Sequence, residues 1–267
     1  MVPKTLWLIG CGNMAGAMLR RWVAAGTVRG VDVFVLNRRE QELPEGVRQG
    51  RVLPEGALPD AVMLGVKPQQ IDEVAAQMAG RIAGVKLLIS ILAGADEAAL
   101  AARFDAQAIV RAMPNLPVEI GKGVVALHSD GAGAEARVAA EALMTPLGLV
   151  EWVEASQFAV VGALAGSGPA FVYRFIDALA AGGAALGLSA EQALRLALAT
   201  AEGGALLAAG SADSPGLLAD KVASPGGSTR AGLNVLDADD ALKRLVAETL
   251  AASVQRDAEM AAAARAS

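Results

Sequence analysis

The sequence is short of the residues that metal centres and disulfide-bonded domains require. It has one cysteine, Cys11, and one histidine, His128, in 267 residues. A lone cysteine cannot form an intrachain disulfide, and so little cysteine and histidine argues against a transition-metal site. Cys11 lies inside a glycine turn, where we expect it to serve packing. His128 follows a predicted strand, where we expect a surface loop. We therefore predict no metal.

Charge of one sign is not concentrated in any part of the chain. The formal net charge is −5 and no dense basic run occurs, which argues against nucleic acid as a partner. No targeting segment is evident, because only a few apolar residues follow Lys4 before the first glycine turn. This composition favours a soluble cytoplasmic enzyme.

Aromatic residues are also scarce, and long apolar runs are interrupted. Aromatics make up 3% of the chain against 54% hydrophobic residues, so the core must be built from alanine, leucine and valine. Residues 155–173 lack charges and approach membrane-spanning length, but Gly166–Pro169 interrupts them. We expect two buried helices separated by a break, and no membrane partner.

What the sequence does contain is a nucleotide-binding pattern at its start. The apolar run Leu6–Ile9 ends at Gly10–Ala15, which reads G-x-G-x-x-A and opens a helix that runs to about Gly26. Such glycines permit a tight turn and a close approach to a pyrophosphate. A second apolar run, Val31–Leu36, follows at the spacing of a βαβ unit. The alternative is a tight strand-to-helix turn that binds no ligand.

The end of that second strand indicates the cofactor. It runs into Asn37-Arg38-Arg39, without the acidic residue that would accept hydrogen bonds from an unmodified ribose. Arg38 or Arg39 could hold a ribose 2′-phosphate with a planar, charged fork. NADPH is therefore favoured, with NADH possible as well; a solvated basic turn is the alternative.

The order of predicted elements indicates two domains. Residues 1–155 alternate strands and helices as in an α/β, Rossmann-type domain with a parallel sheet. Residues 156–267 read as a smaller all-helical domain, with helix starts at Pro169, Ser189 and Ser214. The further strands are predicted at 62–66, 87–91, 108–110, 123–127 and 149–153.

A glycine loop near the C-terminus is the second candidate site. Ser224–Thr229 carries two adjacent glycines directly before a predicted helix, 228–236. Backbone N–H groups at such a helix start can cradle a carboxylate or phosphate, with the Thr229 hydroxyl beside them. An ordinary Pro-Gly turn is the alternative.

Together, several short segments resemble the Δ1-pyrroline-5-carboxylate reductase family in order and in spacing over nearly the whole chain. The matching segments are 9–14, 66–68, 90–94, 111–115, 166–170 and 215–229. The resemblance implies NAD(P)H-dependent reduction of a cyclic imine, 1-pyrroline-5-carboxylate, to L-proline. It also implies a helical domain that joins two chains into a homodimer, in some members assembled further.

The resemblance also implies the site residues. Those expected to touch the dinucleotide are Ile9, Gly10, Cys11, Gly12, Asn13, Met14, Asn37, Val66, Lys67, Pro68, Ile91 and Ala93. Those expected to hold the substrate carboxylate are Ser224, Gly226, Gly227, Ser228 and Thr229. Thr229 would also bond the ring nitrogen, which makes it the predicted catalytic residue.

Departures from the family pattern bear on specificity. Leu116, Phe171, Ala159, Gly162 and Ser228 stand where the family usually has Thr, Tyr, Asp, Thr and Thr. The choice between five- and six-membered imines stays open. Two rival functions remain: a hydroxyacid dehydrogenase-like reductase and a non-catalytic NADP-binding sensor. The first resembles this chain less, because Val172 stands where those enzymes place a catalytic lysine.

Overall fold

The computed structural model describes residues 1–78 and 80–266, and it divides the chain into two compact units. We call Met1–Ser167, together with the end of the last helix from Val254 onward, the sheet unit. Gly168–Ser253 forms the helical unit. The predicted functional boundary near residue 155 stays a prediction.

The sheet unit is built on eight strands in the order β3-β2-β1-β4-β5-β6-β7-β8. The strands are β1 (Leu6–Ile9), β2 (Val33–Leu36), β3 (Arg48–Gly50), β4 (Ala61–Leu64), β5 (Leu87–Ser90), β6 (Ile109–Pro114), β7 (Gly123–His128) and β8 (Gly148–Trp152). All neighbouring strands pair in parallel except β6 and β7. The predicted Rossmann-type sheet is therefore confirmed, with one antiparallel pair added.

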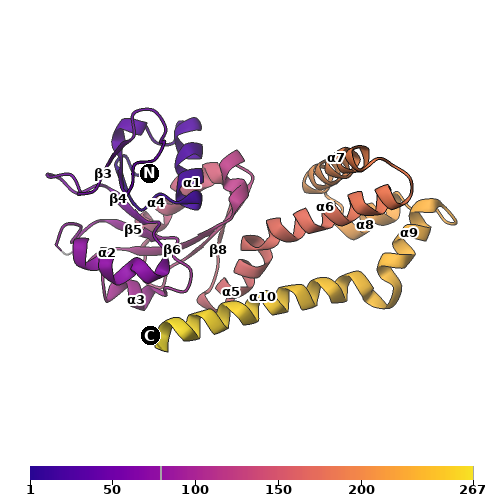
Figure 1. Ribbon diagram of the computed structural model, residues 1–267. Helices are drawn as coiled ribbons and strands as arrows, with labels where there is room; N and C mark the ends of the chain where they lie inside the picture. The colour runs from indigo at the N-terminus through magenta and orange to yellow at the C-terminus, as the bar shows by residue number, and fades with distance from the viewer. Residues whose placement is uncertain (79, 267) are drawn as a thin grey trace. The chain divides into compact units, whose positions relative to one another are not determined.

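Helices cover both faces of this sheet (Figure 1). The helices are α1 (Asn13–Ala24), α2 (Ile71–Met78), α3 (Glu97–Ala101) and α4 (Ala134–Met144). One core cluster packs α1 and α4 against the sheet, and a second cluster packs α2 and α3 against it. The strands β1, β2, β4 and β5 are buried at every residue, which explains their unbroken apolar runs.

Trp22 shows how closely α1 is fixed in this layer. Its side chain is fully buried, and its indole N–H donates to the Leu143 carbonyl oxygen at the end of α4, N···O 2.7 Å. The bond satisfies the one polar atom of a side chain that otherwise fills the apolar core. The C-terminal turn of α1 is thus held in a defined place against α4.

The helical unit consists of α6 (Gly168–Ala185), α7 (Ala190–Ala209), α8 (Pro215–Lys221), α9 (Ser228–Asp237) and the first part of α10 (Ala241–Ala266). The predicted helix starts at Ser189 and Ser214 are confirmed, since each hydroxyl accepts a backbone N–H three residues on. α6 and α7 form a helical hairpin, in which Leu188 and Ala193 pack near Gly183.

The prediction of two buried helices within residues 155–173 is wrong about their burial, because α6 buries none of its residues. Ala155–Ala185 is a run of helix 31 residues long, in which α5 (Phe158–Val161) and a π-helical segment, Gly162–Gly166, lead into α6. In the π-helical segment the Ser167 N–H bonds the carbonyl five residues back, at Gly162, and Ser167 forms a bend before α6. The run Ala155–Ala185 has a mean hydropathy of 1.4. Within the described residues, it is long and apolar enough to cross a membrane, judged by length and composition alone.

Candidate functional site

A cavity in the sheet unit opens at the carboxyl ends of β1, β2 and β4. Its volume is about 840 Å³. In parallel α/β sheets ligands bind at this edge. The lining residues are Ile9, Gly10, Cys11, Gly12, Leu36, Asn37, Arg38, Arg39, Gln41, Arg51, Gly65, Val66, Lys67, Gln70, Glu73, Val74 and Gln77.

The two glycines of the turn at the base of the cavity differ in how closely other atoms surround them. Gly10 has φ +83°, and a Cβ there would lie 2.7 Å from Val66 Cγ1, so only glycine fits. A Cβ added at Gly12 would meet nothing within 4 Å. The absent side chain at Gly12 therefore leaves open space, which is what a closely approaching pyrophosphate requires.

Asn37 supplies a second observation that fits a dinucleotide. Its Oδ1 accepts a hydrogen bond from the Cys11 backbone N–H at 3.2 Å, which ties the end of β2 to the glycine turn. Its Nδ2 is buried and has no partner among the described residues. Leaving a buried donor unpaired costs about 1–3 kcal/mol, which a ligand oxygen in the cavity would recover. The residues present fit a bound dinucleotide.

The arginines at the far side of the cavity are exposed. Arg38 forms an ion pair with Glu73 of α2. Arg39 lines the cavity as expected, and so does Arg51, which the sequence reasoning missed. Arg51 follows β3, a short strand of polar residues and glycine with no apolar run to predict it.

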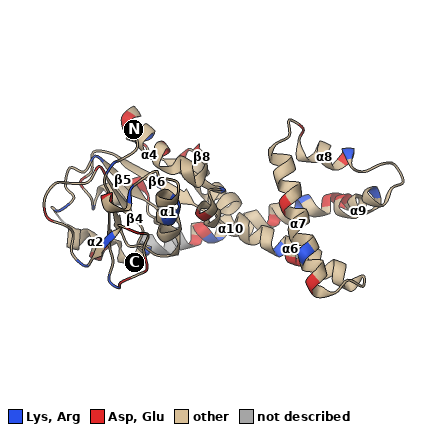
Figure 2. Cartoon of the chain, turned by 90° about the horizontal axis from the view of Figure 1, so that it is seen from above, with Lys and Arg blue, Asp and Glu red and all other residues tan. Residues whose placement is uncertain are grey.

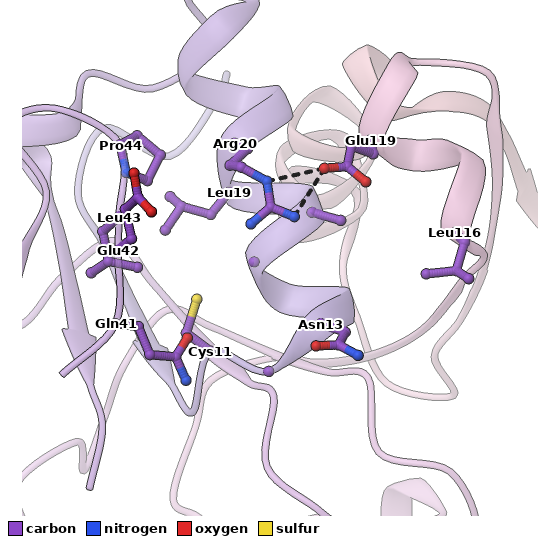
Figure 3. Close-up of a pocket in the computed structure, with 13 residues that line it drawn as sticks. Cys11, Asn13, Leu19, Arg20, Gln41, Glu42, Leu43, Pro44, Leu116 and Glu119 are labelled. Carbon is purple, nitrogen blue, oxygen red and sulfur yellow. Dashed lines mark hydrogen bonds and ion pairs between the residues drawn. The ribbon is translucent and has the colours of Figure 1, made fainter. Parts of the chain in front are cut away.

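A second hollow, of about 470 Å³, lies along α1 on the other side of the glycine turn (Figure 3). It shares Cys11, Gly12 and Gln41 with the larger cavity, and the Asn13 side chain stands at its edge. The Arg20 guanidinium donates twice to Glu119 Oε1, at 3.1 and 3.0 Å, and closes one wall. Leu116, one of the departures from the family pattern, also lines it.

The remaining residues that the resemblance predicts at the cofactor lie in α1 or in the segments that follow β4 and β5. Met14, Pro68, Ile91 and Ala93 line neither cavity. Ile91 directly follows β5, and its N–H donates to the Leu64 carbonyl, N···O 3.1 Å. Met14 is half-buried and packs against the core below α1. Contact of these four residues with a dinucleotide stays a prediction.

The second predicted site lies in the helical unit. The Ser224 carbonyl oxygen accepts a hydrogen bond from the Gly227 N–H, N···O 3.0 Å, and Gly226 between them has φ +73°. This is the geometry of a turn with Pro225 at its second position and glycine at its third. A Cβ at Gly227 would lie 2.7 Å from Ser224 Oγ, so both glycines are needed for this path.

The turn leaves polar groups free at the start of α9. Gly227 is the N-cap, and no side chain caps the helix. The first N–H groups of a helix have no partner inside it. The hydroxyls of Ser224, Ser228 and Thr229 make no hydrogen bond within the described chain, and all three residues are exposed. Thr229 therefore does not cap the following turn; its hydroxyl is available to a ligand.

The single cysteine and histidine are both buried. Burial raises the pKa of the Cys11 thiol, and the nearby Arg20 charge lowers it by less. The surface-loop prediction for His128 is wrong: it ends β7, is 5% exposed, and its Nδ1 lies 2.9 Å from the Val153 carbonyl oxygen. Glu97, His128 and Asp130 place possible ligand atoms within 4.8 Å of one another. The Glu97 oxygens, however, already accept the N–H groups of Asp130 and Gly131.

Two family models match the chain. The one described as "NADP oxidoreductase coenzyme F420-dependent" matches residues 5–94. The one described as "Pyrroline-5-carboxylate reductase dimerisation" matches residues 155–260. The first match covers the part of the chain that contains the cavity, and the second covers the part that contains the glycine loop.

Similar proteins cover nearly the whole chain. It is 35% identical to the pyrroline-5-carboxylate reductase of Synechocystis sp., over 96% of this chain and 97% of that protein. A solved pyrroline-5-carboxylate reductase from Coxiella burnetii has a TM-score of 0.86 at 32% identity, covering 96% and 98% of the two chains. Plasmodium falciparum pyrroline carboxylate reductase, solved with NADP bound, shares the fold with a TM-score of 0.82 at 24% identity, covering 98% and 99%. The chain belongs to the pyrroline-5-carboxylate reductase family.

Proposed function

We propose that this chain reduces 1-pyrroline-5-carboxylate to L-proline with NADPH, as a cytoplasmic homodimer in proline biosynthesis. The observation that carries the proposal is that one chain of this family contains two sites with hydrogen-bond donors that have no partner. One is a dinucleotide-sized cavity with an unpaired Asn37 amide, and the other is a glycine loop with free donors.

The cavity residues would hold the cofactor, and bound NADPH would supply the hydride. Gly10 and Gly12 let the backbone approach the pyrophosphate at the start of α1, where the helix dipole favours negative charge. The unpaired Asn37 Nδ2 would donate to an oxygen of the bound dinucleotide. Val66 and Lys67 line the same cavity and would border the dinucleotide.

The glycine loop would hold the substrate carboxylate. The backbone N–H groups at the start of α9 and the hydroxyls of Ser224 and Ser228 would donate to the anion. The Thr229 hydroxyl bonds the ring nitrogen and steadies it as the imine becomes an amine. The imine is protonated from solution beforehand, so the loop orients and stabilises without supplying a general acid.

The helical unit would complete its core with a second copy of the chain. α6, α8 and α9 bury none of their residues in one chain, and α7 buries only Ala193 and Ala197. The two long helices are mostly uncharged (Figure 2): α6 carries only Arg174 and Asp177, and α7 only Glu191, Arg195 and Glu202. An apolar surface of this extent marks a protein–protein interface. A dimer also accounts for the apolar run Ala155–Ala185 without a membrane, since the matched dimerisation segment begins at residue 155.

The test is NADPH oxidation by the purified protein with three substrates in parallel: 1-pyrroline-5-carboxylate, the six-membered cyclic imine and 2-oxo acids. We expect turnover of the cyclic imines, and Gly12→Val should abolish it by filling the space left for the pyrophosphate. The variant should fold normally, because a Cβ at this position would meet no atom of the chain within 4 Å.

The rival functions give different outcomes. Turnover of 2-oxo acids without cyclic imines would indicate a hydroxyacid dehydrogenase-like reductase. NADPH binding without turnover of any substrate would indicate a non-catalytic sensor. Either result would overturn the proposed reaction.

A further inference from the structure

Arg51 lies at the cavity because of strand pairing. β3 runs parallel to β2 with Gly50 opposite Leu36, and the Asn37 N–H donates to the Gly50 carbonyl, N···O 2.9 Å. Arg51 therefore leaves β3 at the edge where Asn37 leaves β2. The two loops that carry arginines are neighbours at the same edge of the sheet.

Hydrogen bonds fix both loops against each other. The Gln41 N–H donates to Gln49 Oε1 at 3.1 Å, and Gln49 Nε2 donates back to the Gln41 carbonyl at 2.8 Å. Beyond Arg51, the carbonyls of Leu53 and Pro54 accept from the Arg81 guanidinium at 3.2 and 2.9 Å. The backbone on either side of Arg51 is thus held, and its exposed side chain lines the cavity.

The arginines of the cavity differ in their partners. Arg38 is paired with Glu73, so its charge is offset by a carboxylate that also lines the cavity. Arg39 and Arg51 have no carboxylate partner among the residues that the structure describes. A phosphate monoester carries about −1.5 to −2 charges at pH 7, which two unpaired guanidinium groups match.

We propose that Arg51, together with Arg39, binds the 2′-phosphate of NADPH and sets the preference over NADH, while Arg38 stays with Glu73. The proposal rests on the proposed function only for the identity of the dinucleotide. It moves the main determinant of cofactor choice from the end of β2, where such folds usually place it, to the residue after β3.

The test measures binding without turnover, by calorimetric titration with adenosine 2′,5′-bisphosphate and 5′-AMP, which differ in the 2′-phosphate alone. Arg51→Ala should weaken the bisphosphate by about tenfold to a hundredfold and leave 5′-AMP nearly unchanged. Arg51→Lys should fall between, because it keeps the charge and loses the fork.

Two control variants separate this effect from general charge loss. Arg48→Ala removes an exposed arginine from the same strand, three residues earlier and outside the cavity. The double variant Arg38→Ala/Glu73→Gln removes the ion pair without changing net charge. Both should change the ratio of the two affinities by less than about twofold, as expected for an exposed pair or a remote charge.

The proposal fails if Arg51→Ala shifts both ligands equally, or if it has no more effect than Arg48→Ala. A larger effect in the double variant than in Arg51→Ala would also overturn it, since Arg38 would then carry the phosphate. These outcomes are separate from the proposed reaction. A protein that turned over no imine could still bind the bisphosphate through Arg51. Conversely, an NADH-linked reductase could reduce the imine without binding a 2′-phosphate at Arg51.

Discussion

The sheet unit and the helical unit differ in how their apolar side chains are covered. Leu6, Leu8 and Ile9 in β1 are at most 1% exposed, and two core clusters fill both faces of the sheet. In the helical unit, Leu186 is 90% exposed and Leu207 is 68% exposed. The first unit has a complete core in one chain; the second leaves apolar side chains exposed in one chain, where we propose that a second copy packs.

The sharpest way to break this comparison is to separate the units. A fragment of residues 1–167, which is the sheet unit without its segment from Val254 onward, should fold and bind NADPH, because every residue that lines the cavity lies within it. It should lose all imine reduction, since Ser224–Thr229 is missing. Calorimetry and NADPH oxidation on the same preparation test both points, and an active fragment would remove the glycine loop from the site.

A charge on the exposed face of α7 should have the next largest effect. Leu206→Glu/Leu207→Glu should weaken the dimer at least about a hundredfold, because burying unpaired carboxylates costs several kcal/mol. Sedimentation should show monomers at concentrations where the parent protein is dimeric. Val138→Glu on α4 is the matched control: it is also an exposed apolar helix residue, but of the sheet unit, and should leave the dimer intact. A monomeric parent protein would contradict the expected dimer outright.

Replacing one hydroxyl in the glycine loop should have a smaller and more selective effect. Thr229→Val should lower kcat/KM for the imine by about 10–100-fold, with NADPH affinity unchanged. The melting temperature should stay constant, because the hydroxyl makes no bond within the described chain. Thr229→Ser should keep most activity.

Thr249→Val is the matched control, since that hydroxyl donates to the Leu245 carbonyl at 2.8 Å within α10. It should leave imine kinetics as they are. Unchanged kcat/KM in Thr229→Val would exclude Thr229 from catalysis.

The smallest effect concerns the reactivity of Cys11. Since burial raises its pKa, the thiol stays protonated near neutral pH and presents no thiolate to an alkylating agent. Iodoacetamide should modify the folded protein at least about tenfold more slowly than the chain unfolded in urea. Equal rates, followed by mass spectrometry, would show that the glycine turn opens readily.

The fold could be predicted to the extent that it depends on short-range patterns. Unbroken apolar runs predicted the buried strands, and a serine before each helix predicted the starts of α7 and α8. The strand β3 could not be found in this way. Its residues are Arg, Gln and Gly, and backbone pairing with β2 places them in the sheet.

Missing β3 had a consequence for the site. The glycine turn and Asn37-Arg38-Arg39 were identifiable because each directly follows an apolar strand, and the structure brings them together at one cavity. Arg51 joins them through pairing between strands, which no local pattern reports. The burial of His128 was missed for a similar reason, because β7 extends to that residue and β8 leads to the Val153 carbonyl beside it.

The placement of the tryptophans makes one optical signal specific to one unit. All three, Trp7, Trp22 and Trp152, lie in the sheet unit. Fluorescence excited at tryptophan wavelengths therefore follows only the environment of the sheet and of α1, where Trp22 is buried against α4. Far-ultraviolet circular dichroism registers the helices of both units. A denaturation midpoint that differs between the two signals would show the helical unit melting separately.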